Sequence, residues 1–418
     1  MHHFQYINGD LCCEGIRIED VADHVGTPFY LYSHATLTRH FRAFDQAFDG
    51  IDRLVCYSAK ANSSQAILRL FARLGSGLDI VSGGELFRGL KAGFDPAKIV
   101  YSGVGKTAAE IDSALQHGIF MLNVESQPEM ELINERAGLL GCRAPVAVRV
   151  NPDVDPKTHP YISTGLKKNK FGLSPQAALE VYRDAHRMAH IEIKGIDCHI
   201  GSQITDAGPF RDALARLRAL IDQLAQENID IGVVDVGGGL GITYQDEQPP
   251  HPKAYGDAIR EGLSGLDVRL VLEPGRVIVG NAGLLVTRVL YRKEGDHKSF
   301  LVVDAGMNDL LRPSLYDAHH DIWSVREAFG QHRIMADVVG PICETGDFLC
   351  RDREVPDTPP GDLLAVMSAG AYGFTMASNY CSRLRVPEVM IKDDAFHVIR
   401  KRQTYEDLIA GEVIPDFL

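Results

Sequence analysis

The segment Leu54-Val-Cys-Tyr-Ser-Ala-Lys60-Ala-Asn62 predicts a short buried strand that ends in a lysine, and a stretch with helical spacing, Ser63 to Leu74, follows directly. A lysine at the carboxyl end of a strand, beside apolar walls, is expected to be desolvated, which lowers the pKa of its amine. An uncharged amine can form a Schiff base with a carbonyl group. A lone lysine more often extends to solvent, but similar strand ends recur along this chain.

Eight short apolar segments alternate with amphipathic stretches in this part of the sequence. The predicted strands are 54–58, 78–81, 98–102, 119–124, 146–150, 194–199, 231–236 and 268–273. Helical spacing is visible between them, for example in Thr107–His117, Pro175–His190 and Pro209–Glu227. Eight such units over this length favour an α/β fold with a closed parallel (β/α)8 barrel, a TIM barrel, over an open doubly wound sheet.

After residue 280 the pattern changes to strands joined by turns rich in Gly, Pro and Asp, with little helix. The predicted strands are Leu284–Arg292, Ser299–Asp304, Ile334–Val339, Leu363–Met367, Glu388–Ile391 and Phe396–Arg400. Phe4–Ile7 and Pro28–Tyr32 also resemble strands, and we expect them to pair with the later ones, whereas Arg351–Gly361 is predicted to be a polar surface loop. We therefore expect a barrel at 36–279 and an all-β domain, a sandwich or barrel, formed by 1–35 and 280–418.

The composition limits the class of partner. Hydrophobic residues make up 45% and charged residues 24%, as in an ordinary globular enzyme. With 43 basic and 56 acidic residues the net charge is −13, which argues against nucleic acid or an anionic membrane as the main partner. The eight cysteines show no CxxC spacing, which predicts reduced thiols, and the 16 histidines show no metal-ligand spacing, so no metal is assigned. Neither a signal peptide nor a membrane-spanning run is visible, and a cytoplasmic location is expected.

Polar residues stand at nearly every predicted end of a barrel strand. They are Lys60, Asp79, Ser102, Asn123 with Glu125, Arg149 with Asn151, His199, Gly237-Gly238-Gly239 and Glu273. Because reactive groups of such barrels lie at the carboxyl ends of the strands, this ring predicts a site on one face. A ring of satisfied structural groups is the alternative, and it fits less well.

Several members of the ring would suit a phosphorylated aldehyde cofactor. The glycine turn would let backbone N–H groups approach a phosphate, although three glycines can also simply form a tight turn. Glu273 opens Glu-Pro-Gly-Arg276, and a carboxylate facing a pyridine nitrogen would keep that ring protonated and able to store an electron pair. His199 could lie flat against the ring or be a buried histidine bonded to a neighbour.

Longer motifs carry a family resemblance over almost the whole chain. They are Tyr57–Asn62, Asp79–Glu85, His159–Gly165 with Lys170-Phe-Gly172, His199–Gln203, Gly237–Gly239, Glu273–Arg276, Leu311–Tyr316, Gly340–Asp347 and Ala369–Gly373. In this order they resemble the fold-type III pyridoxal-phosphate decarboxylases, which join an alanine-racemase-like barrel to a β domain, and within that group the diaminopimelate decarboxylase family. The resemblance implies pyridoxal 5'-phosphate as cofactor and conversion of meso-2,6-diaminopimelate to L-lysine and carbon dioxide, the last step of lysine biosynthesis.

The resemblance also implies roles around the cofactor. Lys60 would bind it covalently, His199 would stack on its ring and Glu273 would face its pyridine nitrogen. The residues expected at its phosphate are Ser202, Gly238, Gly239, Gly275, Arg276 and Tyr372. Asp79 and Glu85 match family positions close to the cofactor.

The same resemblance implies how substrate would be bound. The residues expected there are Arg276, Arg312, Tyr316, Glu344 and Tyr372, with the arginines and Tyr316 on the distal carboxylate and Glu344 on the distal amine. Cys343 would approach from the neighbouring subunit of a homodimer and return a proton after carbon dioxide leaves. The residues themselves agree, because a Cys-Glu pair in a glycine-flanked loop supplies an acid beside an ion-pairing carboxylate. A structural cysteine next to a surface glutamate is the alternative.

Other functions stay open. The same chemistry could act on ornithine, arginine or carboxynorspermidine, although ornithine-type relatives usually carry aspartate where this chain has Glu344. A racemase fits less well, since no tyrosine base stands in the expected context. A non-catalytic regulator would tend to lose Lys60 or Cys343, and both are present. His319-His320, just past Tyr316, has no predicted role.

Overall fold

The chain forms two compact units in the computed structural model, which describes residues 2–154 and 170–418. The barrel unit comprises Thr38–Ile278. The β unit comprises Met1–Leu37 together with Val279–Leu418. The β unit is therefore assembled from two stretches of sequence that flank the barrel unit.

The barrel unit is built on a closed sheet with the strand order β10-β11-β12-β5-β6-β7-β8-β9. Its strands are β5 (Arg53–Ser58), β6 (Gly77–Ile80), β7 (Ile99–Tyr101), β8 (Met121–Val124), β9 (Ala144–Arg149), β10 (Ile191–Asp197), β11 (Val233–Asp235) and β12 (Arg269–Leu272). All neighbours pair in parallel, and β12 closes the sheet on β5 through Leu270, Val271 and Leu272. The predicted (β/α)8 barrel is confirmed. All carboxyl ends consequently meet at one rim.

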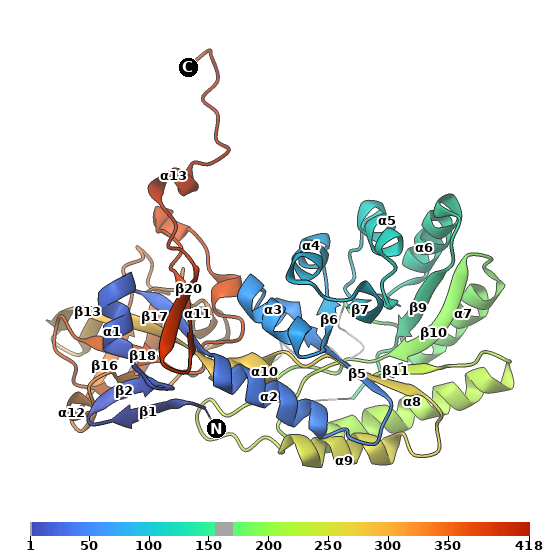
Figure 1. Ribbon diagram of the computed structural model, residues 1–418, viewed down its shortest axis with the longest axis horizontal. Helices are drawn as coiled ribbons and strands as arrows, with labels where there is room; N and C mark the ends of the chain where they lie inside the picture. Colours follow the sequence, from blue (N-terminus) through green and yellow to red (C-terminus); the bar gives the residue numbers. More distant parts are fainter. Residues whose placement is uncertain (1, 155–169) are drawn as a thin grey trace. The chain divides into compact units, whose positions relative to one another are not determined.

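Helices lie on the outer side of this barrel (Figure 1). They are α2 (His34–Gln46), α3 (Gln65–Arg73), α4 (Gly83–Ala92), α5 (Ala108–His117), α6 (Gln127–Leu140), α7 (Pro175–Arg187), α8 (Gly208–Gln226) and α9 (Pro252–Gly262). Each buries one apolar stripe; α3, for example, buries Ile67, Leu68 and Phe71. Helix α7 ends at Arg187, three residues before its predicted end at His190. The reason is local, because Met188 is already extended and leads the chain into β10.

The β unit contains a long mixed sheet with the strand order β17-β16-β14-β13-β4-β19-β20; β18 pairs with β13, and β15 pairs with β18. Its strands are β4 (Phe29–Ser33), β13 (Gly283–Glu294), β14 (Ser299–Val303), β15 (Ile322–Ser324), β16 (Arg333–Val339), β17 (Phe348–Pro356), β18 (Leu363–Val366), β19 (Glu388–Lys392) and β20 (Ala395–Arg400). Strand β4 pairs with both β13 and β19. The expected pairing of the N-terminal segment with the later strands is thereby confirmed for β4.

The rest of the N-terminal segment folds differently from the expectation. Strands β1 (Phe4–Ile7), β2 (Asp10–Cys13) and β3 (Ile16–Arg17) form a three-stranded sheet of their own, followed by helix α1 (Ile18–Val25). A β-bridge between Asp10 and Arg326, with backbone hydrogen bonds such as that from Leu11 to Val325, connects this small sheet to the later part of the β unit.

The prediction of a surface loop at Arg351–Gly361 is wrong in its first half. Strand β17 continues to Pro356 and pairs antiparallel with β16. Its charged run is mostly exposed and lies on the last strand of the sheet. Charged side chains are typical of such edge strands, where they oppose unwanted pairing with another chain, so polarity did not exclude a strand here.

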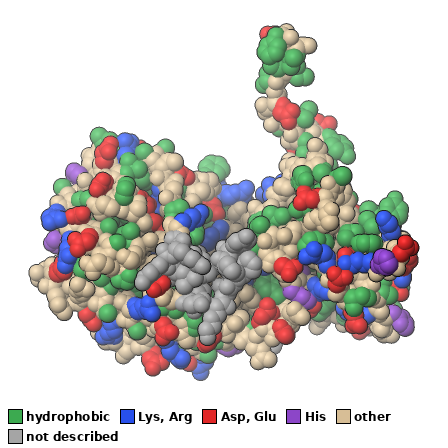
Figure 2. All heavy atoms as spheres, turned by 180° about the vertical axis from the view of Figure 1, so that it is seen from behind, with side chains coloured by type: hydrophobic (Ala, Val, Ile, Leu, Met, Phe, Trp, Pro, Cys, Tyr) green, Lys and Arg blue, Asp and Glu red, His purple; other side chains and the backbone are tan. Residues whose placement is uncertain are grey.

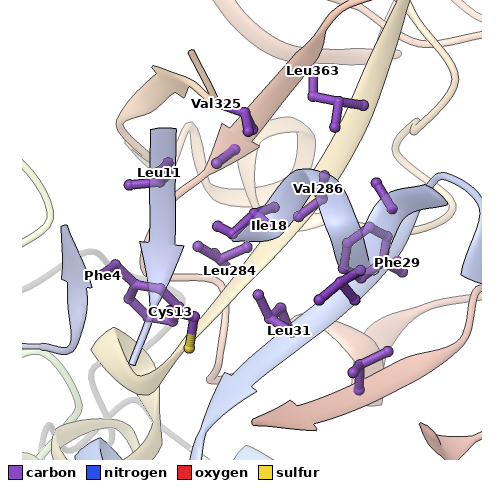
Figure 3. Packing of buried hydrophobic residues seen from close by; sticks show 14 of the residues in the cluster. Phe4, Leu11, Cys13, Ile18, Phe29, Leu31, Leu284, Val286, Val325 and Leu363 are labelled. Carbon is purple, nitrogen blue, oxygen red and sulfur yellow. The ribbon is translucent and has the colours of Figure 1, made fainter. Parts of the chain in front are cut away.

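A compact apolar core holds the β unit together. Phe4, Leu11 and Ile18 from the small sheet and α1 meet Phe29 and Leu31 of β4, and all five are buried. Figure 3 shows these side chains gathered with those of β13 and β18 and with Val325, which follows β15. The N-terminal segment is thus an integral part of this core.

The surface carries both signs of charge. On the face drawn in Figure 2, basic and acidic side chains are interspersed. Across residues 2–154 and 170–418, no helix combines the length and the apolar character that crossing a membrane requires.

Candidate active site

Lys60 lies in the short 3₁₀ turn η1 (Ala59–Ala61) that follows β5 at once. Its Nζ forms an ion pair with Asp79 of β6, which the register between Ser58 and Asp79 places beside the strand end. The side chain of Lys60 is 35% exposed, whereas that of Asp79 is fully buried. The Lys60 side chain is thus only partly desolvated, and a carboxylate from the neighbouring strand stands beside its amine.

Asp79 is a buried carboxylate that accepts hydrogen bonds from more than one side chain. Its Oδ2 accepts from Ser58 Oγ at 2.7 Å as well as from Lys60. Its other oxygen, Oδ1, is buried and has no hydrogen-bond partner among the described residues. Glu85, in the first turn of α4, accepts from the backbone N–H of Val81 at 2.7 Å, and burial raises the pKa of its carboxyl.

His199 lies two residues after the end of β10, and its hydrogen bond selects one tautomer of the ring. The backbone N–H of Gly238 donates to its Nδ1 at 3.1 Å, so that nitrogen is an unprotonated acceptor. Burial, reinforced by the cations Arg149 and Lys60, lowers the pKa of His199 well below its usual value. The ring is therefore neutral. A Cβ on Gly237, which has φ 64°, would lie 2.6 Å from Nδ1, so the ring position depends on that glycine.

Glu273, directly after β12, belongs to a buried hydrogen-bonded chain. Ser102 Oγ donates to its Oε1 at 3.3 Å, and Asn123 links Ser102 to Asp235 at 3.1 and 3.2 Å. Burial, together with the negative charges of Asp235 and Asp79, raises the pKa of Glu273 well above its usual value. Burial also raises the pKa of Asp235 to about 6. A carboxyl in this position is able to hold a proton at neutral pH.

Arg149, at the end of β9, supplies the compensating charge inside the barrel. Its Nη1 donates to Glu125 at 2.9 Å, and its Nε lies 3.8 Å from Asp197. Burial lowers the pKa of Arg149, but attraction to the carboxylates of Glu125 and Asp197 outweighs burial, so the pKa is raised overall. Burial and nearby Asp235 raise the pKa of Asp197 well above normal.

A cradle of polar side chains and glycines lies between the ends of β10, β11 and β12. Ser202 Oγ accepts from Arg276 Nη2 at 3.0 Å, and Arg276 Nη1 donates to Tyr244 Oη at 2.7 Å. Arg276 is 5% exposed and begins the short helix α10 (Arg276–Val279).

The glycines of this cradle permit a close approach of backbone segments. A Cβ on Gly238 would lie 2.2 Å from the carbonyl oxygen of Glu273, and one on Gly239, at φ 111°, would lie 2.5 Å from that of Gly201. A Cβ on Gly275 would lie 3.0 Å from Ala61, beside the Lys60 turn. The cradle, the unsatisfied Asp79 oxygen and the proton-holding Glu273 together fit a phosphorylated pyridine aldehyde.

The β unit holds a second group of predicted residues around helix α11 (Arg312–Tyr316). The Arg312 guanidinium stands 5.8 Å from the centre of the Tyr316 ring and is 6% exposed. Ser314 Oγ donates to the carbonyl of Gly346 at 2.6 Å, which ties α11 to the loop 340–347. The predicted carboxylate-binding pair and the Cys343-Glu344 loop are therefore neighbours within this unit.

The loop 340–347 presents Cys343 and Glu344 to solvent. Asp347 fixes its base by accepting from the backbone N–H groups of Met307 and Ile342, both at 2.6 Å. Tyr380 Oη donates to Glu344 Oε2 at 2.7 Å. A structural, buried Cys343, the alternative considered from sequence, is excluded by its exposure.

Tyr372 also belongs to the β unit. It follows β18 in a turn where its own φ is 55°, an uncommon conformation for a tyrosine. The predicted motif His159–Gly165 lies outside the described residues. In the adjoining motif, the N–H of Gly172 donates to Glu125 Oε2 at 2.8 Å and so supports the Arg149 pair.

Sequence reasoning missed several members of the two groups. Tyr244 contacts Arg276 and Tyr380 contacts Glu344, and both tyrosines lie in segments without a sequence motif, so only tertiary contact reveals them. Asp235 could have been predicted from the sequence, because it stands at a strand end, two residues before the glycine turn.

Comparison with known proteins identifies the family of the chain. Residues 34–280 match the family model described as "Pyridoxal-dependent decarboxylase, pyridoxal binding domain". A protein of Pseudomonas aeruginosa named diaminopimelate decarboxylase is 52% identical over 412 residues, covering 99% of each chain.

Solved structures of diaminopimelate decarboxylases are also similar to this chain. The diaminopimelate decarboxylase of M. jannaschii in complex with L-lysine superposes with a TM-score of 0.95 at 39% identity and full coverage of both chains. That of Helicobacter pylori complexed with L-lysine gives 0.91 at 45% identity, covering 94% of this chain and 98% of the other. The chain belongs to the diaminopimelate decarboxylase family of pyridoxal-dependent decarboxylases.

Proposed function

We propose that the chain catalyses the pyridoxal-phosphate-dependent decarboxylation of meso-2,6-diaminopimelate to L-lysine and carbon dioxide. The observation that carries the proposal is the barrel group itself. Lys60 with Asp79, His199, Glu273 with its raised pKa, and Ser202 with Arg276 stand at the carboxyl ends of the barrel strands. They do so in a chain about half identical, over its whole length, to relatives of that name.

Each predicted cofactor-binding residue has a task toward the cofactor. Lys60 would bind its aldehyde carbon, with Asp79 keeping the amine in place until it reacts. His199 would lie against the ring, and Glu273 would supply and hold the proton at the pyridine nitrogen. Ser202, Gly238, Gly239, Gly275, Arg276 and Tyr372 would bind the phosphate. When bound, the cofactor supplies an electron-poor ring that stores the electron pair left by departing carbon dioxide.

The β-unit group would select the substrate. Arg312 offers a planar pair of donors suited to a carboxylate, with Tyr316 against it, and Glu344 offers an anion for the distal amine. Arg276 would contribute a second positive charge near the carboxylate. Ornithine has no second carboxylate, so Arg312 and Glu344 together favour diaminopimelate.

Cys343 would return a proton to the substrate carbon. Its exposure to solvent supports this role, because a proton donor has to be accessible to the molecule it protonates. We further propose that the enzyme is a cytoplasmic homodimer in which Cys343 serves the site of the neighbouring subunit.

Shared sites can be tested by mixing inactive variants. Lys60→Ala and Cys343→Ala homodimers are each expected to be inactive, whereas random subunit exchange should restore about a quarter of the activity, since half the dimers then carry one intact site. No recovery, or a fully active monomer, would contradict the shared site.

The substrate is tested by assaying carbon dioxide release from meso-2,6-diaminopimelate in parallel with L-ornithine, L-arginine and carboxynorspermidine. We expect L-lysine from diaminopimelate and no comparable turnover of the others. Turnover of another amine would retain the cofactor site and discard the substrate. Lys60→Ala should abolish the visible absorbance of bound cofactor; a regulator without catalysis would show that absorbance and turn over nothing.

A further inference from the structure

His320 is a buried histidine in direct contact with Arg312. Arg312 Nε donates to His320 Nε2 at 3.3 Å, and both residues lie inside the β unit, with His320 fully buried and Arg312 6% exposed. The neighbouring His319 is different: its Nε2 contacts Asp321 at 3.0 Å and Arg353 at 3.2 Å, and its side chain is 21% exposed.

The other ring nitrogen fixes the state of His320. Its Nδ1 lies 2.8 Å from the carbonyl oxygen of Met367. A carbonyl oxygen only accepts, so Nδ1 carries the hydrogen. In the neutral ring Nε2 is then an acceptor, which is what a guanidinium N–H requires, whereas a protonated ring would present an N–H to a cation.

This contact controls the direction of the guanidinium. Nε is the point at which the planar group joins its side chain, so a hydrogen bond there fixes rotation about the last bonds of Arg312. The direction in which the Nη1–Nη2 edge points is fixed with it. Bidentate binding of a carboxylate depends on that direction more than on charge alone.

The support behind His320 is rigid. Met367 directly follows strand β18, and its N–H donates to the carbonyl of Asp321 at 2.8 Å. Arg353 Nη1 donates to the carbonyl of His320 at 3.0 Å. The His320 ring is thus held at Nδ1 by the Met367 carbonyl and its backbone is held by Arg353, so the ring is a fixed point against which Arg312 can be aligned.

We propose that His320 is a positioning residue for Arg312 and thereby sets the affinity of the site for the distal carboxylate of its ligand. This inference rests on the proposed function, because it uses Arg312 as the carboxylate-binding residue. It predicts a selective effect. Ligands that carry the carboxylate should lose affinity when His320 is changed, and ligands that lack it should not.

The test compares two ligands of nearly equal length. L-lysine keeps the α-carboxylate that remains after decarboxylation of one end of diaminopimelate, whereas 1,5-diaminopentane has none. In the holoenzyme His320→Asn, the amide can still donate to Met367 but does not reach Arg312. We expect its Kd for L-lysine and its KM for diaminopimelate to rise about five- to tenfold, the effect of one lost hydrogen bond. We expect kcat and the Kd for 1,5-diaminopentane to stay within about twofold.

Three further variants keep the result interpretable. His320→Gln places an amide oxygen near the position of Nε2 and should restore most of the L-lysine affinity. His319→Asn, the adjacent control, should leave both affinities unchanged. In an Arg312→Ala background, His320→Asn should add no further loss of L-lysine affinity, because its effect passes through Arg312.

The outcomes separate the inference from the proposed function. Three results would overturn the positioning role: an equal loss of affinity for both ligands, a fall in kcat alone, or an added loss of L-lysine affinity in the Arg312→Ala background. Unchanged affinities in a His320→Asn enzyme that folds with a normal melting temperature would also overturn it. If His320→Asn does not fold, the inference is judged on His320→Gln and His319→Asn. An equal loss of L-lysine affinity in these two variants would then overturn it. Failure of the wild-type enzyme to turn over diaminopimelate would instead reject the proposed function.

Discussion

Replacement of Arg149 by methionine should be among the most damaging single changes in the barrel unit. Arg149 is buried, 2.9 Å from one oxygen of Glu125 and 3.8 Å from Asp197. Methionine fills much of the same space but leaves both carboxyls without their cation. Removal of one partner from a buried ion pair costs about 3–5 kcal/mol, roughly 10²- to 10⁴-fold in the unfolding equilibrium.

The assay is urea unfolding of the wild-type enzyme and of Arg149→Met, followed by circular dichroism at pH 8 and pH 5. The penalty should be smaller at pH 5, because the pKa of Asp197 is raised and its carboxyl takes up a proton more readily than a free one. A double-mutant cycle with Glu125→Gln should give a coupling energy of about 1–3 kcal/mol, since the neutral amide no longer needs the cation.

Arg183→Met provides the matched control. Arg183 contacts Glu227 at 2.6 Å, but both side chains are about one-third exposed, so solvent screens the pair and the change should be small. We expect burial to decide the strength of this network. That reasoning is refuted if Arg149→Met lowers the free energy of unfolding by less than about 1 kcal/mol, equally at both pH values, and if its effect adds to that of Glu125→Gln without coupling.

Three further predictions follow from single sites. Burial raises the pKa of Asp309 to about 7, so the native carboxyl keeps its proton where the unfolded one has lost it. From pH 5 to pH 8 the free energy of unfolding should therefore fall by about 2–3 kcal/mol more in the wild type than in Asp309→Asn. Gly238→Ala, whose Cβ would meet the Glu273 carbonyl at 2.2 Å, should weaken cofactor binding to the apoenzyme by at least about tenfold. Cys343→Ala should lower kcat by about 10²–10⁴-fold and leave cofactor absorbance unchanged.

Each of these has an internal control. Parallel pH profiles for Asp309→Asn and the wild type would contradict the first. Gly105→Ala, where an added Cβ meets nothing within 4 Å, should bind cofactor normally, and equal affinity in the Gly238 variant would contradict the second. Cys381→Ala removes the other exposed cysteine and should retain full kcat; a Cys343→Ala enzyme of equal kcat would contradict the third.

The barrel could be predicted because its strands are buried on both faces and therefore appear as continuous apolar runs. All eight predicted strands are present, with ends shifted by a few residues. Strand β17 could not be predicted in the same way, because its edge position exposes Arg351 to Glu354 and gives the sequence the polarity of a loop.

The site could be predicted as a set of residues but not as a set of contacts. The position of Lys60 after β5 followed from the pattern, yet its pairing with Asp79 depends on the register between two strands. The contact of His320 with Arg312 depends on a turn after α11 and on Met367, 47 residues further on. No local pattern signals a partner that lies so far away in sequence.

The place of β4 in the β unit has a consequence for synthesis of the chain. All five of its residues are buried, and its partners β13 and β19 are encoded only after the whole barrel unit. At about 5–20 residues per second, roughly 10–50 s of translation separate β4 from β13. During that interval an apolar strand with two unpaired edges is exposed on the ribosome-bound chain, so β4 is the segment where a chaperone should bind the nascent polypeptide.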